Sequence, residues 1–257
     1  MQKRPVIVML VDQSDLSRLM YHGLQKRYEI ARVIVEEPVS KKVLLQRRLK
    51  RLGYRKVVGQ LLFMVFSKMM RPFSQKRIDA IRKRYEVEDV PYPSEKVAEV
   101  PSVNAPITID LLKKLKPDVV VVNGTRIISE EVLGAIDAPF INTHTGITPK
   151  YRGVHGGYWA LTQSDAENCG VTVHLVDKGI DTGAILYQAK IDVSRKDNFN
   201  TYPYLQVLEA VPLMVRAIED ALDGKLETIV RNDLESKIWS HPTMGEYLKY
   251  YIRMGVK

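Results

Sequence analysis

The stretch PDVVVVNGTRIISEEVLGAIDAPFINTH, residues 117–144, is the clearest guide to the fold of this chain. It begins with a run of four valines, residues 119–122, and an unbroken β-branched run is typical of a parallel strand buried on both faces. A second apolar run, residues 140–144, follows after an intervening segment. Two strands joined by a crossover predict a parallel sheet of the α/β class.

The flanking sequence continues this alternation. Toward the N-terminus we expect a strand, a helix with Ser14 as its N-cap and a second strand, at residues 5–11, 15–27 and 28–35. The remaining expected elements are a helix at 107–115, strands at 171–175 and 184–191, and a helix at 202–223. Gly224 ends this last helix. The predicted fold is α/β, with a doubly wound, mostly parallel sheet.

Residues 41–86 predict a helical insertion between the second and third strands, broken at Gly53 and Pro72. Its residues 41–84 hold fifteen Lys and Arg and a single acid, Asp79, in a chain whose formal net charge is +9. Leucines recur at helical spacing in the first helix and leave the arginines on other faces. Such a surface contacts phosphates, anionic lipid or only water, and the sequence leaves these alternatives open.

The chain of 257 residues suffices for one α/β domain and a small appendage, which we place at residues 1–224 and 225–257. The single cysteine, Cys169, has no internal disulfide partner, and no Cys/His cluster has the spacing of a metal site. A cytoplasmic protein is therefore expected. No apolar run approaches the ~20 residues of a membrane span, and residues 5–11 are interpreted as a strand and not a signal peptide.

Three side chains carry candidate chemistry. Asn142 and His144 lie two apart on a predicted strand, so they point to the same side. Asp181 lies in a glycine-flanked turn, residues 179–183. Acyl transfer to an amine needs a donor for the oxyanion and a base for the proton, and a carboxylate near the imidazole orients the reacting groups. These residues predict an acyl-transfer site.

The motifs INTHTGITPKYRG, residues 141–153, and GVTVHLVDKGIDTGAIL, residues 170–186, resemble those of the 10-formyltetrahydrofolate-dependent formyltransferase family. NGTRIISEEVL, residues 123–133, matches the segment that precedes them in that family, and the three blocks occur in the family's order. The resemblance implies a Rossmann-like formyltransferase core and 10-formyltetrahydrofolate as the formyl donor. Asn142, His144 and Asp181 are then the catalytic residues.

The resemblance also implies two sets of binding residues. The donor would be bound, largely through backbone groups, by Asn123, Gly124, Thr125, Arg126, Ile127, Val176, Asp177 and Gly179. The acceptor would contact Tyr151, Arg152, Gly153 and His155. Tyr158 and Trp159, in the same stretch, are expected to pack a helix into the core.

The favoured acceptor is the amino group of a nucleotide-linked amino sugar. Methionyl-tRNA formyltransferases add a C-terminal domain that the residues after 224 are too few to form. The turn VDQSDLS, residues 11–17, lacks the glycines of the loop that binds glycinamide ribonucleotide. These two acceptors remain alternatives, as does hydrolysis of 10-formyltetrahydrofolate.

Two further expectations concern partners. The alternative to an enzyme is a protein that binds nucleic acid or an anionic membrane and keeps only a vestigial formyltransferase core. Residues 41–84 would be its contact surface. A homodimer through the aromatic residues of segment 239–251 is a second expectation.

Overall fold

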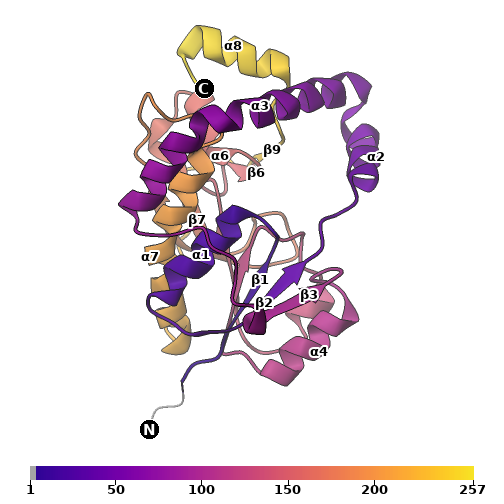
Figure 1. Ribbon diagram of the computed structural model, residues 1–257, viewed down its shortest axis with the longest axis vertical. Coiled ribbons are helices and arrows are strands. Elements are labelled where there is room, and N and C mark those ends of the chain that lie inside the picture. The colour runs from indigo at the N-terminus through magenta and orange to yellow at the C-terminus, as the bar shows by residue number, and fades with distance from the viewer. Residues whose placement is uncertain (1–3) are drawn as a thin grey trace.

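The computed structural model describes residues 4–257 and contains a seven-stranded sheet in the order β3-β2-β1-β4-β5-β7-β8 (Figure 1). The first five strands in that order are parallel, whereas β7 and β8 are antiparallel to their neighbours. This confirms the predicted α/β class and mostly parallel sheet. The strands are β1 Ile7–Val11, β2 Ile30–Glu36, β3 Val97–Val100, β4 Val119–Asn123, β5 Phe140–His144, β7 Gly170–Leu175 and β8 Ile185–Lys190.

Helices cover both faces of the sheet, and alternate strand residues point to opposite sides. In β1, Met9 packs into the cluster under α1 Asp15–Gln25 and α7 Tyr202–Leu222, while Leu10 joins the cluster with α4 Pro106–Leu115 and α5 Glu130–Leu133. The valines of β4 divide in the same way. The central strands are therefore buried on both faces, as their apolar runs predict.

The insertion forms two helices, α2 Lys41–Leu52 and α3 Tyr54–Arg84, which meet at Gly53. The predicted break at Pro72 is wrong, because α3 continues through it. Its buried side chains lie on both sides of the proline, namely Val57, Gln60, Phe63, Ser74, Ile78 and Ile81. Packing along the whole helix offsets the backbone hydrogen bond that Pro72 cannot donate.

Two elements were not anticipated. The stretch 90–106, in which no element is predicted above, contains a short 3-10 turn, Ser94–Lys96, and the edge strand β3. The C-terminal segment contains the helix α8 Met244–Met254, which begins at a reciprocal pair of hydrogen bonds between Thr243 and Glu246. This capping box is visible in the sequence as Thr-x-x-Glu.

The residues after α7 pack on the insertion and on the segment before α6 Gly156–Thr162. A short strand, β9 Ile238–Trp239, pairs with β6 Arg152–Gly153, and the ring of Tyr247 on α8 lies 5.5 Å from that of Phe63 on α3. Figure 1 shows α8 beside α3 at one end of the molecule. Tyr158 and Trp159 are buried, as predicted.

Among residues 4–257, no helix combines the length and the hydropathy needed to cross a membrane.

Candidate active site

The candidate site lies at the end of β5, where the sheet changes from parallel to antiparallel. In the antiparallel pair of β5 and β7, Asn142 lies opposite His174. The turn after β7 then returns toward β5 and carries Asp181. A cavity of about 210 Å³ lies between these groups and the loop that follows β4. Its lining comprises Val122, Thr125, Arg126, Ile127, Ile128, Asn142, Gly153, His174, Val176, Asp177, Gly179, Ile180 and Asp181.

His144 is buried and is held at both ring nitrogens. Its Nε2 lies 2.7 Å from the carbonyl oxygen of Tyr151, which only accepts hydrogen bonds, so this nitrogen donates. Its Nδ1 lies 3.3 Å from Oδ2 of Asp181. The same carboxylate oxygen accepts the backbone N–H of Gly153 at 2.9 Å. The fold therefore brings the predicted imidazole and carboxylate into direct contact.

Asn142 is oriented by His174, a residue that the sequence analysis did not single out. Nδ1 of His174 lies 2.7 Å from the carbonyl oxygen of Leu175 and must donate to it. Burial lowers the pKa of His174, which favours the neutral ring, so its Nε2 is an acceptor. The side-chain nitrogen of Asn142 lies 3.1 Å from this Nε2 and donates to it. This contact fixes which end of the amide is nitrogen.

The turn that carries Asp181 is tightly constrained. Asp181 has a φ of 51°, in the left-handed region that Asp tolerates better than most residues. Asp177 fastens the turn, because its carboxylate accepts the backbone N–H of Gly179 at 2.9 Å and the hydroxyl of Thr182 at 2.7 Å. A Cβ on Gly183 would lie 1.6 Å from the carbonyl oxygen of Leu175. The Gly-x-Asp-Thr-Gly sequence is thus required by the backbone path.

Six of the eight residues predicted to bind the donor line the small cavity: Thr125, Arg126, Ile127, Val176, Asp177 and Gly179. The side chain of Arg126 is already engaged, because its guanidinium pairs with Glu36 at 2.6 Å and donates to the carbonyl oxygen of Glu37 at 2.6 Å, and its backbone N–H donates to Glu36 at 2.7 Å. Gly124 lies outside, beside Asp12. Asn123 is buried, its side-chain oxygen accepts the hydroxyl of Ser17 at 2.9 Å, and it lines neither this cavity nor the larger one described below.

Of the four residues predicted to contact the acceptor, only Gly153 lines a cavity near the site. Tyr151 is fully buried, and its hydroxyl donates to Asp165 at 2.7 Å, so the prediction that it touches the acceptor is not supported. Arg152 pairs with β9 through its backbone. His155 lies 2.9 Å from His241, nitrogen to nitrogen, and burial lowers its pKa to about 4.

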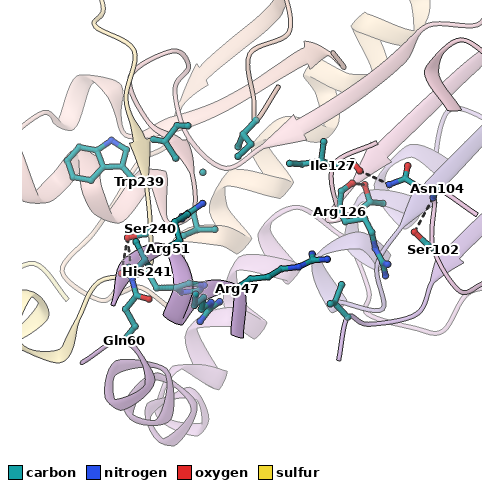
Figure 2. Close-up of a pocket in the computed structure, with 18 residues that line it drawn as sticks. Arg47, Arg51, Gln60, Ser102, Asn104, Arg126, Ile127, Trp239, Ser240 and His241 are labelled. Atoms are coloured by element: carbon teal, nitrogen blue, oxygen red, sulfur yellow. Dashed lines mark hydrogen bonds between the residues drawn. The ribbon is translucent and has the colours of Figure 1, made fainter. Parts of the chain in front are cut away.

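A second, larger cavity of about 710 Å³ adjoins the first (Figure 2). The two share lining residues, namely Thr125, Arg126, Ile127, Gly153 and Ile180. Its outer wall is formed by α2 of the insertion, and another wall by the segment after β9. The amide of Gln60 on α3 fastens that segment by donating to the carbonyl oxygen of His241 at 2.7 Å. That the insertion and the C-terminal segment enclose one space cannot be predicted from the sequence alone, because it depends on tertiary packing.

Comparison with known proteins identifies the family. A family model described as formyl transferase matches residues 65–217. The methionyl-tRNA formyltransferase of Caldanaerobacter subterraneus subsp. tengcongensis is 32% identical over 143 residues, which are 55% of this chain and 46% of that protein. That of Pelotomaculum thermopropionicum is 34% identical over 141 residues, 54% of this chain and 45% of that protein. The matched part of the chain spans about half the length of these curated relatives.

Solved structures share the fold at low identity. A 4-N formyltransferase from Francisella tularensis has a TM-score of 0.56 and 15% identity, with 91% of this chain and 76% of that chain covered. Glycinamide ribonucleotide transformylase 1 from Symbiobacterium toebii has a TM-score of 0.56 and 17% identity, with 93% and 96% covered. Because the family model spans more than half of the sequence, and the same fold recurs in these structures, the chain belongs to the formyl transferase family.

Proposed function

We propose that the protein transfers a formyl group from 10-formyltetrahydrofolate to the amino group of a nucleotide-linked amino sugar. The observation that carries this proposal is the contact between Asp181 and His144, 3.3 Å apart, at a cavity whose wall also holds Asn142. Asp181 comes from a different segment of the sequence than Asn142 and His144, and the fold brings it to His144. Membership of the formyl transferase family supports the same reaction class.

The lining of the small cavity supports binding of the pterin ring of the folate donor. Five aliphatic side chains line it, Val122, Ile127, Ile128, Val176 and Ile180, and such walls suit the faces of a flat heterocycle. The loop at residues 122–128 and the turn at 176–181 would hold the pterin, in part through backbone groups. When bound, the donor supplies the formyl carbonyl that the amine attacks.

Asn142 stabilises charge in this scheme. One N–H of its amide is donated to His174, which leaves the second N–H for the formyl oxygen as negative charge develops there. Donors held in place before the reaction lower the barrier most, because no reorganisation is needed when the charge appears. His174 acts on Asn142 and is a positioning residue.

His144 and Asp181 accept and hold the proton that the attacking amine loses. The imidazole is anchored by the carbonyl of Tyr151, while Asp181 faces its other nitrogen and the cavity. A carboxylate beside an imidazole stabilises the protonated ring, so a proton taken from the amine can be held there. The backbone N–H of Gly153 keeps the carboxylate in position.

The larger cavity supports an extended acceptor. Its volume of about 710 Å³ is in the range of sites for ligands larger than a single sugar. A structure described as a likely sugar N-formyltransferase from Mycobacterium tuberculosis shares the fold, with a TM-score of 0.55, 13% identity and coverage of 95% of this chain and 85% of that chain. Both observations favour a nucleotide-linked sugar over a small amine.

The test is release of tetrahydrofolate from 10-formyltetrahydrofolate by the purified protein, with and without a panel of nucleotide-linked amino sugars. We expect release that requires one of these acceptors and is lost in His144→Ala. Release that is independent of any acceptor would assign the protein as a hydrolase instead. An absence of release with the whole panel would overturn the proposed acceptor class.

A further inference from the structure

Three arginines of α2 line the larger cavity, Arg47, Arg48 and Arg51. Their spacing places Arg51 one helical turn from both Arg47 and Arg48, so the three guanidinium groups share one side of the helix. In Figure 2, the side chain of Arg47 extends from α2 toward Arg126 on the loop after β4. Of the described residues that line this cavity, none is an Asp or a Glu.

These arginines differ from those in the second half of the insertion. On α3, Arg71, Arg77 and Arg82 form ion pairs with carboxylates outside the helix at 2.5 to 3.2 Å, and they thereby attach the helix to the rest of the molecule. Within residues 4–257, no ion pair involves an arginine of α2. The only polar side-chain contact found for the three is that of Arg48 with the sulfur of Met64, at 3.1 Å.

The cluster is electrostatically unfavourable as it stands. Burial lowers the pKa of Arg48, and the neighbouring charge of Arg51 lowers it further. No side chain of α2 is fully buried, so the arginines are not placed by the demands of a packed core. Like charges gathered at the edge of a cavity, without carboxylates, are stabilised when an anion enters.

Many nucleotide-binding α/β folds hold phosphate at a site that cannot accept phosphate in this protein. That place is the N-terminus of α1, but Oδ1 of Asp12 already accepts the backbone N–H of Ser14 at 3.1 Å and the hydroxyl of Ser17 at 2.6 Å. Asp15 adds a second carboxylate in the first turn of the helix. Two negative charges at this position repel a phosphate, so a phosphorylated ligand would have to be bound elsewhere.

We propose that Arg47, Arg48 and Arg51 form a phosphoryl-binding subsite for the acceptor, and that this subsite selects acceptors whose amine is carried on a diphosphate ester. The inference rests on the proposed function, because the cavity is taken to be the acceptor's. Guanidinium groups match phosphoryl oxygens with paired hydrogen bonds. A diphosphate carries its negative charges on two adjacent groups, so it matches this compact cluster of arginines. The glutamate tail of a folate spreads single charges along a chain and matches the cluster less well.

The first test measures binding and needs no formyl transfer. Inorganic pyrophosphate and a nucleoside diphosphate, UDP, are titrated calorimetrically into wild type, Arg47→Ala/Arg51→Ala and Arg47→Lys/Arg51→Lys. Lys41→Ala/Lys42→Ala is the matched control, because it removes equal charge from the same helix at residues that do not line the cavity. We expect affinity to fall at least about tenfold in the alanine pair, less in the lysine pair, and to remain unchanged in the control.

The outcomes separate this inference from the proposed function. Equal losses in the alanine pair and in the control would mean general charge attraction and would overturn the subsite, as would failure of wild type to bind either probe. A loss confined to the alanine pair in a protein without formyl transfer would retain the subsite and reject the proposed function. Weaker binding of a folate triglutamate, with pyrophosphate binding intact, would assign the arginines to the donor and overturn the inference.

A kinetic measurement supplies the second test in an active preparation. The alanine pair should raise the KM of the acceptor with little change in kcat, since the arginines lie away from the reacting groups. A fall in kcat at unchanged KM would contradict a subsite for the acceptor.

Discussion

At the residue scale, the geometry of the site depends on which groups donate and which accept each hydrogen bond. Both nitrogens of His144 face oxygen acceptors, the carbonyl of Tyr151 at 2.7 Å and the carboxylate of Asp181 at 3.3 Å. The ring can donate to both only when it carries a proton on each nitrogen, and this geometry underlies the role proposed for it in proton transfer. The neutral His174, in contrast, accepts from Asn142 and keeps that amide in place.

The first prediction concerns Asp181→Asn. An amide in this position keeps the size of the side chain but removes the negative charge beside His144 and the cavity, so formyl transfer should fall by about 10²-fold to 10⁴-fold. The measurement is kcat for tetrahydrofolate release with a saturating acceptor. Asp137→Asn, at an exposed position, is the control and should retain wild-type kcat. A fully active Asp181→Asn variant would remove the carboxylate from the mechanism.

The second prediction concerns His174→Phe. The phenyl ring fills similar space without an acceptor for the amide of Asn142, so kcat should fall by about tenfold to a hundredfold, less than in Asn142→Ala. The KM values should change little, and His174→Gln, which restores an acceptor, should recover part of kcat. If His174→Phe were as inactive as Asn142→Ala and the glutamine gave no recovery, His174 would do more than orient the amide.

At the scale of secondary-structure elements, the insertion and the C-terminal segment decide the shape of the larger cavity. The helix α3 contacts α8 through Phe63 and Tyr247, and it fastens the segment before α8 through Gln60. Figure 1 shows α2 at one end of α3, above the sheet in this view, with a connection that leads down to β2. The helix α3 is thus the support on which both walls of the cavity depend.

The third prediction concerns Pro72→Ala in α3. Pro72 is exposed in a continuous helix, where it lacks the N–H for one helical hydrogen bond. Alanine restores that bond, so the free energy of unfolding should rise by on the order of 1 to 3 kcal/mol. Urea denaturation of the two proteins measures this difference. A lower stability in the variant would show that the helix is bent at the proline in solution.

The fourth prediction concerns the buried pair of His155 and His241, which joins the start of α6 to the segment after β9. Burial lowers the pKa of His155 to about 4 and that of His241 to about 3, below the ordinary value of 6.5. Between pH 6.5 and pH 4 the unfolded chain therefore binds more protons than the folded protein, so stability should fall as the pH falls through this range.

The change should be on the order of 2 kcal/mol for each histidine between pH 7 and pH 4.5. It is measured as the difference in urea denaturation between wild type and His155→Gln/His241→Gln. The double variant should show a weaker decline over this range. An equal decline in both proteins would mean that the histidines are hydrated in solution.

At the scale of the whole molecule, the parts that the sequence predicts are those set by local patterns. The valine run of β4 and the Ser14 cap predict the core sheet and α1 closely, because burial on both faces and capping act within a few residues. Strand β3 was missed because it is short and lies at the edge, with only Val100 fully buried. Pro72 was misjudged because long-range packing overrides a local helix breaker.

The residues of the site also divide into those that local patterns predict and those that long-range packing determines. Asn142 and His144 share a strand, so sequence spacing alone places them together. His174 could not be found, since its position opposite Asn142 depends on β7 running antiparallel to β5. The α2 arginines were seen as a basic surface, but their position on the cavity follows from how α3 carries α2 over the sheet edge.

The central claim is that Asn142, His144 and Asp181 together transfer a formyl group to an amine. The most direct measurement supplies 10-formyltetrahydrofolate labelled with carbon-13 in the formyl group, and a nucleotide-linked amino sugar, to wild type, Asn142→Ala and His144→Ala, and then locates the label by mass spectrometry. We expect label on the acceptor amine with wild type only. Label recovered solely as formate with wild type, or equal labelling of the acceptor by all three proteins, would contradict it.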